Sequence, residues 1–547
     1  MKAEPNSKFL RIISFLIISS LAFRTEMLIS IVATQPLDTF SYEFIVNEDG
    51  FTIVNITYTT DADFGSSWLL VPKFSKWVNH TVTGKVIEWQ IRDIQELVGT
   101  SYHFYEALWF SFNSDGYEFK MNVQFNASTA AMVIEPDGIF YSPQIGFQKG
   151  QLKAKVILPE GFSINQDEAI AFGNAGSYRP NPTDSGPNYV LFDNIPEAEN
   201  FVRIEIGFRT LRRTPEWLTT QAGVFTFRTV PRYKESAWAI LALFNKTYER
   251  LVDIFNVTLG NAEVRFFLPD FDSLFSVAGY VPFSSERIGE IYINIVFTRY
   301  VEGYVEVTAL HELVHHFLWK TGISPQTLLW FHEGMAEYIS IEVANELGYE
   351  GARITKQELE DGIVQLKKMV GEDIGFIKQW SPSSQSPNTW PYYVGAYYVV
   401  SRLAETYGGV EYYARFFRLI KGKTIDSNDE ITYSLGLAAN RSVAETLNNW
   451  GFEVPDLYLY SPLLGRAEET LDEVNPIFQP YKLLAELLYR QALLNARQES
   501  TSEMQFYLAA AIFVARLAPL LTLITISGIL FGAVLLALSA KGVFSRH

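Results

Sequence analysis

Four of the seven histidines in this chain of 547 residues lie within one short stretch, from His311 to His332. His311 and His315 are four residues apart, and the residues around them have good helical propensity. Residues four apart on a helix share one face, so both imidazoles can bind the same metal ion. Glu312 follows the first histidine and can act as a general base toward water at that metal. The spacing therefore predicts metal-assisted hydrolysis.

A metal site of this kind needs a third protein ligand, because catalytic zinc holds three side chains and leaves a fourth position for water or substrate. Glu333 is the candidate, on a second helix that we expect Ser324 and Pro325 to begin as N-cap and first-turn proline. His332 is the rival ligand, but it points about 100° away from Glu333 on that helix. We therefore predict Zn²⁺ bound by His311, His315 and Glu333.

The composition narrows the classes of site and partner. The chain has no cysteine, which excludes thiolate zinc sites, iron–sulfur clusters and a cysteine nucleophile. Its formal net charge is −17, from 44 Lys+Arg against 61 Asp+Glu, and nucleic-acid binding needs a basic surface instead. Apolar residues make up 48% of the chain, too many for a disordered polymer. We therefore expect folded domains and no nucleic-acid partner.

The motif and its surroundings resemble a known family. H-E-x-x-H followed by a Glu within Trp330-Phe-His-Glu-Gly-Met-Ala-Glu-Tyr338 is similar to the gluzincin metallopeptidases, particularly the aminopeptidase N family. Residues 316–332 separate the second histidine from the Glu, a connection one residue shorter than in that family. The resemblance implies a thermolysin-like α+β catalytic domain, a zinc cofactor, and a peptide or protein as substrate.

The same resemblance gives roles to two further side chains. In that family a catalytic Tyr follows the Glu by about sixty residues in a Y-x-x-G context, and Pro391-Tyr392-Tyr393-Val394-Gly395 matches it. The resemblance thus implies that Tyr392 stabilises the oxyanion; the alternative is an ordinary aromatic in a tyrosine-rich stretch. Glu337 lies on the same helix face as Glu333, where it either orients a ligand histidine or is simply solvated.

One departure from the family leaves the substrate class open. The exopeptidases of that family carry a G-x-M-E-N strand whose Glu binds the substrate amine, and neither Val277–Phe283 nor Gly289–Asn294 contains this motif. Glu290 could lie on an edge strand that pairs with substrate. Endopeptidase and aminopeptidase activity both remain open. A catalytically silent adhesion or scaffold protein on a peptidase-like fold is the alternative outside enzymes.

The elements that must position these residues change in character along the chain. From Ser41 to about Arg212, aromatic and β-branched residues alternate with polar ones, which predicts an antiparallel β-sandwich. A helix over Ser236–Phe255 and strands over Ala262–Leu268 and Gly289–Phe297 follow, and helices dominate from Val305 to Trp450. This order predicts a β domain before a mixed catalytic domain.

Both ends of the chain carry apolar segments. A basic flank precedes the apolar run 12–23, which is typical of a cleaved signal peptide, with an uncleaved anchor as the alternative. Leu517–Ala540 contains no charged residue and is long enough to cross a bilayer. Lys541 and Arg546 follow it, so we expect a cytoplasmic C-terminus and an extracellular catalytic domain. With the anchor retained, the chain would cross twice.

The predicted fold is therefore multidomain α+β, in a membrane-tethered extracellular zinc metallopeptidase. The expected segments are a signal peptide or anchor (1–33), a β-sandwich (34–212), a gluzincin-like catalytic domain (213–456), a helical stalk (457–516), a transmembrane helix (517–540) and a cytoplasmic tail (541–547).

Overall fold

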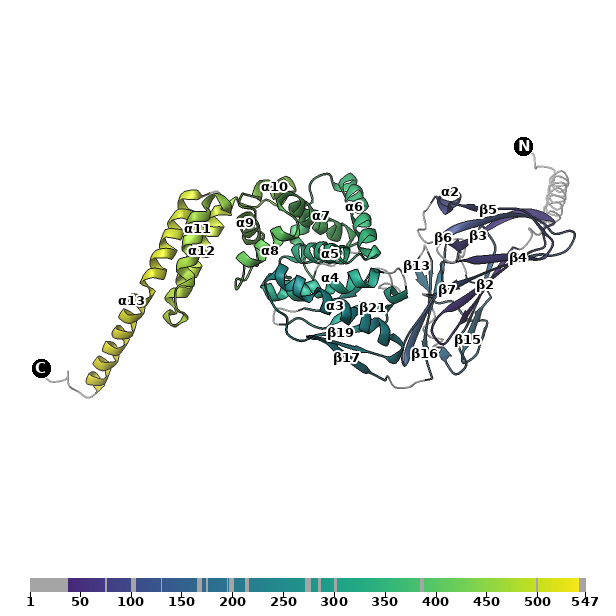
Figure 1. Ribbon diagram of the computed structural model, residues 1–547, viewed down its shortest axis with the longest axis horizontal. Coiled ribbons are helices and arrows are strands. Elements are labelled where there is room, and N and C mark those ends of the chain that lie inside the picture. The colour runs from purple at the N-terminus through teal and green to yellow at the C-terminus, as the bar shows by residue number, and fades with distance from the viewer. Residues whose placement is uncertain are drawn as a thin grey trace, which may run out of the picture.

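The computed structural model describes the chain from residue 38 to residue 540, with internal gaps. The gaps are 74–75, 100–104, 129, 165–169, 174–175, 194, 196–200, 212–215, 271–276, 284–286, 300–302, 384–387 and 498–499. The predicted signal peptide or anchor and the cytoplasmic tail lie outside the described residues. Three parts follow one another along the long axis: a region of sheets, a mixed centre, and a helical extension that ends in one long helix (Figure 1).

The N-terminal part is built on a seven-stranded sheet. In β1 (Thr39–Val46) and β2 (Thr52–Thr60) every second side chain is buried, as the alternating sequence predicts. All its pairs are antiparallel except β1 with β10, which run parallel. The spatial order is β14 (Asp184–Ser185), β15 (Tyr189–Phe192), β10 (Gln151–Ile157), β1, β2, β7 (Phe119–Ala127) and β4 (Trp77–Thr83).

Two smaller sheets complete this part. Phe44 of β1, Phe110 of β6 and Phe140 of β9 are fully buried in one apolar cluster, so the sheets share a core. One sheet contains, in spatial order, β13 (Gly176–Tyr178), β12 (Ile170–Gly173), β16 (Arg203–Arg209), β9 (Asp137–Tyr141) and β8 (Ala131–Ile134), with β11 (Ser163–Ile164) also on β16. The other contains β3 (Phe64–Pro72), β6 (Tyr105–Asn113) and β5 (Lys85–Arg92), and helix α2 (Ile94–Val98) follows β5.

A five-stranded sheet opens the central part, with helix α3 (Lys234–Phe255) packed against it after the short turn η3 (Pro231–Tyr233). Its order is β17 (Leu218–Ala222), β18 (Phe225–Thr229), β19 (Ala262–Phe267), β21 (Ile291–Asn294) and β20 (Gly279–Tyr280). Strand β21 ends three residues earlier than the sequence suggests. The Asn294 side chain accepts a hydrogen bond from the Val296 N–H at 3.0 Å, which starts the 3₁₀-helix η4 (Ile295–Arg299) instead.

Helices make up the rest of the central part. Their bounds are α4 (Tyr304–Thr321), α5 (Leu329–Glu346), α6 (Glu350–Val370), η5 (Gly375–Gln379), α7 (Trp390–Tyr407), α8 (Val410–Leu419), α9 (Asn428–Ala439) and α10 (Ala444–Asn449). Helix α5 is buried nearly all round and packs on both α4 and α7. Its predicted start at Ser324 is wrong, because residues 324–328 form a turn in which the Leu328 N–H donates to the Ser324 carbonyl.

The helical extension begins at η6 (Leu457–Tyr460) and α11 (Ser461–Asp472). The turn η7 (Pro476–Phe478), α12 (Tyr481–Arg497) and α13 (Thr501–Ala540) follow. Among the described residues, α13 is the one helix long and apolar enough to cross a membrane, and its most apolar stretch is not covered by the rest of the protein. The predicted stalk and transmembrane segment thus share one helix, with no break at residue 517.

Candidate metal centre

Helix α4 places the two histidines of the motif side by side. Their Nε2 atoms lie 3.2 Å apart, which follows directly from the spacing of four residues on one helix face. His315 is buried, and the His311 side chain keeps 13% of its surface exposed. The pair is therefore largely shielded from solvent, and His311 is the more accessible of the two rings.

Helix α5 brings the predicted third ligand to the same point. Glu333 Oε2 lies 3.3 Å from His311 Nε2 and 3.5 Å from His315 Nε2. Gly334 lets α5 come close to α7, because a Cβ at this position would lie 2.5 Å from the Ala396 carbonyl oxygen. The close packing of these helices thus fixes where Glu333 can reach.

The three residues fit a zinc ion by chemistry and by spacing. Ligand atoms of His311, His315 and Glu333 all lie within 4.8 Å of one another. In a tetrahedral site with bonds of about 2.0–2.1 Å, neighbouring ligand atoms are separated by about 3.3–3.4 Å. The separations of 3.2, 3.3 and 3.5 Å match that geometry. The donor set is two imidazole nitrogens and one carboxylate oxygen, as in catalytic zinc sites.

Glu312 lies beside this cluster in a buried position. Burial raises the pKa of its carboxyl to about 7, although the neighbouring His311 and His315 act in the opposite direction. Gly279 of strand β20 packs directly on it, since a Cβ there would lie 2.8 Å from both Cγ and Oε1 of Glu312. Glycine at 279 therefore leaves the room that this carboxylate occupies.

The charges of the cluster shift each other's protonation. Burial disfavours the charged form of His311, but the carboxylates of Glu337, Glu333 and Glu312 outweigh it and raise the His311 pKa well above its usual value. Burial also disfavours ionised Glu333, yet His315 and His311 hold the pKa of Glu333 below its usual range. Glu337 Oε1 lies 3.6 Å from His311 Nδ1, on the ring edge opposite Glu333. Glu337 is thus placed to orient His311.

The remaining histidines of the cluster lie outside the ligand set. Nε2 of His332, the rival ligand, donates to the Ile323 carbonyl at 2.9 Å. Burial lowers the pKa of His332 to about 4, and it does the same to His316. Both rings are therefore neutral parts of the packing around the site.

The structure distinguishes the two adjacent tyrosines of helix α7. Tyr392 lines a cavity of about 560 Å³ with Phe376 and Lys378, and its ring centroid lies 5.3 Å from that of Trp380. The pKa of Tyr393 is instead raised well above its usual value, first by the negative charge of Glu333, then by burial and by Glu312 and Glu337. Tyr393 is thus the tyrosine whose pKa the site carboxylates raise, and Tyr392 lines the cavity beside Lys378.

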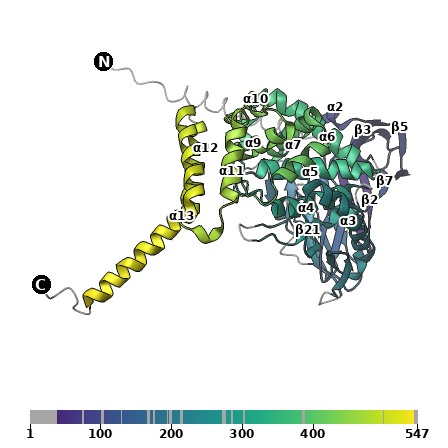
Figure 2. The same ribbon diagram turned by 60° about the vertical axis from the view of Figure 1, so that its left-hand side comes forward.

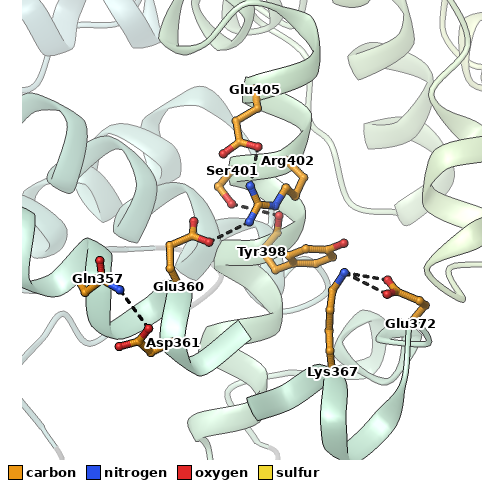
Figure 3. A network of polar contacts seen from close by, with 9 residues as sticks. All are labelled: Gln357, Glu360, Asp361, Lys367, Glu372, Tyr398, Ser401, Arg402 and Glu405. Atoms are coloured by element: carbon orange, nitrogen blue, oxygen red, sulfur yellow. Dashed lines mark hydrogen bonds and ion pairs between the residues drawn. The ribbon is translucent and has the colours of Figure 1, made fainter. Parts of the chain in front are cut away.

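Helix α7 is held on α6 by ionic and aromatic contacts (Figure 3). Arg402 of α7 pairs with Glu360 of α6 at 2.8 Å. Lys367 of α6 lies 4.6 Å from the ring centroid of Tyr398 and pairs with Glu372 at 2.9 Å. These contacts fix the face of α7 that lies against α6, and thereby the orientation of the tyrosines in its first turn.

The residue suggested for substrate pairing has another environment. Glu290 does not lie on the edge strand: it precedes β21, and its carboxylate forms an ion pair with Arg265 of β19. In the described part of this sheet the edge strands are β17 and β20, and β20 carries Gly279 against Glu312. The strand beside the site is therefore β20.

Comparison with known proteins adds little to this geometry. No family model matches the chain, and no curated protein matches it. Among solved structures, the chain is similar to native yeast LTA4 hydrolase, with a TM-score of 0.30 and 11% sequence identity over 81% of this chain and 73% of that one. This likeness is too distant to carry a functional conclusion, which has to come from the site itself.

Proposed function

We propose that the chain is a membrane-tethered zinc metallopeptidase whose catalytic part lies outside the cell. One observation carries the proposal: ligand atoms of His311, His315 and Glu333 lie at the separations of a tetrahedral metal site, with the carboxylate of Glu312 beside them. A metal site with a purely structural role does not need a protonatable carboxylate next to its three ligands. A hydrolytic site requires one.

Each residue of the site has a separate role in the proposed peptide hydrolysis. Zinc held there would polarise the scissile carbonyl and make water nucleophilic at neutral pH. Glu312 takes the proton from the attacking water and passes it to the leaving amine, and a pKa near 7 allows both transfers. Tyr393 stays protonated and donates a hydrogen bond to the oxyanion that develops on the substrate. Glu337 orients the ring of His311.

The sheet beside the site supports an extended peptide as substrate. A peptide that adds to the outer edge of β20 would pass along Gly279 and therefore close to Glu312. Glu290 is engaged with Arg265 and supplies no free carboxylate for a substrate amine. Whether the enzyme cuts inside chains or at their amino ends is read from its cleavage positions.

Helix α13 supports the tether. The apolar run Leu517–Ala540 within it exceeds the roughly 20 residues that a bilayer core requires. Lys541 and Arg546 follow in the sequence, which favours a cytoplasmic C-terminus and a catalytic part outside.

The deciding experiment uses the full chain in detergent micelles with a mixed peptide library and elemental analysis for zinc. Glu312→Gln removes the base and keeps the ligands, so zinc content should stay equal while the rate falls by about 10²- to 10⁴-fold. The matched control Glu350→Gln, at an exposed position of α6, should change neither. Full activity in Glu312→Gln would overturn the mechanism. A zinc-loaded wild type that cleaves no peptide would point to a silent scaffold instead.

A further inference from the structure

We propose that the tip between α11 and α12, residues 475–487, is immersed in the outer leaflet of the bilayer beside α13. The partner of the tip is lipid. The turn η7 and the start of α12 would then be embedded in the bilayer together with α13, and α13 would not be the only attachment. The inference rests on the proposed membrane tether.

The length of α13 beyond the tip gives the first reason. The Tyr481 hydroxyl lies 2.6 Å from the Thr525 hydroxyl, which fixes the start of α12 at the level of Thr525. The helix from Thr525 to Ala540 is about 22 Å long at 1.5 Å per residue. A hydrocarbon core is about 30 Å thick, so this free part is too short by about 8 Å. The missing 8 Å of the membrane span must therefore come from the part of α13 before Thr525, which lies beside the tip.

The side chains of the tip match an apolar environment. Ile477 is 73% exposed, Leu483 50% and Leu487 53%. Lys482 and Glu486 are the charged residues of the tip, and both are partly buried. Leu523, on the adjacent part of α13, is also largely exposed. Contiguous exposed apolar side chains of this kind mark a surface that meets a membrane or another protein, and continuity with the apolar helix favours the membrane.

The polar side chains of Asn475, Gln479 and Lys482 in the tip make local hydrogen bonds, which favours immersion in lipid. The side-chain oxygens of Asn475 and Gln479 accept hydrogen bonds from backbone N–H groups at 3.0 and 3.2 Å and so cap η7 and α12. Lys482 Nζ donates to the Val474 carbonyl at 3.0 Å, which draws its charge toward α11. The Thr525 hydroxyl also donates to the carbonyl one turn back, at 2.8 Å.

The arrangement of the helices agrees in both views. Helix α13 runs alongside α12 and then continues alone, well past the other helices of the extension (Figures 1 and 2). Ala485 of α12 and Ala515 and Ala518 of α13 share one small buried cluster with Leu471 of α11. The tip is thus packed against α13, so that its depth follows the depth of that helix.

The absence of cysteine allows a direct test with single labelled positions in the full chain. Ile477→Cys reports on the tip, Leu536→Cys on the span and Phe506→Cys on the α13 segment above it; the three native side chains are 73%, 73% and 67% exposed. Each variant carries an environment-sensitive fluorophore and is reconstituted in phosphatidylcholine vesicles containing doxyl-labelled phosphatidylcholine as quencher. We expect quenching at Ile477 and Leu536 to exceed that at Phe506 several-fold.

The three probes separate the possible failures. Strong quenching at Leu536 with none at Ile477 would leave the tether intact and overturn the immersed tip, making it a surface for a protein partner. No quenching at Leu536 would remove the tether and this inference with it. Equal quenching at all three positions would also overturn the proposal, because Phe506 would then lie as deep in the bilayer as the tip.

Discussion

At the scale of single residues, the site separates two carboxylates that lie close together in space. Glu333 faces both histidines, and its interactions with the two rings keep its pKa below the usual range. Glu312 is equally buried, but burial dominates there and raises its pKa to about 7. Two like groups whose environments move their pKa values apart have different tasks. Glu333 therefore suits a permanently ionised ligand, and Glu312 suits a group that exchanges protons.

The ligand assignment predicts a graded loss of zinc. Glu333→Ala removes a direct ligand, so bound zinc should be lost after dialysis. Glu337→Gln keeps the ligands and removes only the charge beside His311 Nδ1, so zinc affinity should fall by about 10- to 100-fold. Zinc content and competition with a chelator measure both effects. Unchanged zinc in Glu333→Ala would refute its role as third ligand.

The two tyrosines of α7 predict opposite results for the same change. Tyr393→Phe removes the hydroxyl that senses the site carboxylates, so kcat should fall by about 10²- to 10³-fold with a small change in KM. Tyr392→Phe removes a hydroxyl from the cavity near Lys378 and should change kcat little. Steady-state kinetics on one cleaved peptide compares them. A large loss in Tyr392→Phe alone would return the role to Tyr392.

The sequence predicts which side chains of one helical turn meet, and it leaves the choice between the two tyrosines open, for one physical reason. His311, Glu312 and His315 belong to one helical turn, where spacing alone decides which side chains meet. The choice between Tyr392 and Tyr393 depends on how α7 is rotated against α5 and α6. Packing contacts such as Arg402 with Glu360 set that rotation, and no local pattern encodes it.

At the scale of elements, the packing of α5 on α7 determines where Glu333 lies relative to the two histidines. Gly334→Ala places a methyl group 2.5 Å from the Ala396 carbonyl oxygen, and backbone has to shift to admit it. Such overpacking costs about 1–3 kcal/mol of unfolding free energy. The shift also moves Glu333 relative to the histidines, so zinc affinity should fall together with stability. Thermal unfolding and zinc titration measure the two effects.

Gly465→Ala is the matched control, because a Cβ on that helical glycine of α11 meets no atom within 4 Å. It should leave zinc binding unchanged and stabilise the chain by up to about 1 kcal/mol through helix propensity. If Gly334→Ala behaved like this control, close packing of α5 on α7 would not be what positions Glu333.

Element boundaries show where sequence patterns stop being sufficient. The helix predicted over Ser236–Phe255 has nearly those bounds, and α4 begins at Tyr304, next to the predicted start of the helical region at Val305, because the apolar spacing of both is local. Helix α5 begins at Leu329, five residues after the predicted N-cap Ser324. The Ser324 N–H donates instead to the carbonyl of Ile425 at 2.9 Å. A contact with a residue a hundred positions away overrides the capping preference of serine.

At the scale of the whole molecule, the N-terminal sheets and the central part have separate apolar cores. One apolar cluster fills the N-terminal sheets, and another fills the five-stranded sheet and helices α3 to α10. Between them, Arg232 pairs with Glu135 at 2.8 Å and the Tyr141 hydroxyl donates to the Pro269 carbonyl. Met132 and Tyr141 of the N-terminal sheets pack into the apolar core of the central part. Events at the metal site should therefore act mainly on one of the two cores.

Removal of zinc tests this separation. A ligand bound only to the folded state adds RT ln(1 + [L]/Kd) to stability, about 4 kcal/mol at a free concentration one thousand times Kd. Chelation should therefore lower the unfolding transition of the catalytic part by several degrees and leave that of the N-terminal sheets nearly unchanged. Scanning calorimetry of the full chain in detergent, at one scan rate, resolves the transitions with and without chelator. A single transition that moves as a unit would contradict the separation, because stabilisation at the metal site would then have reached both cores through the Arg232–Glu135 interface.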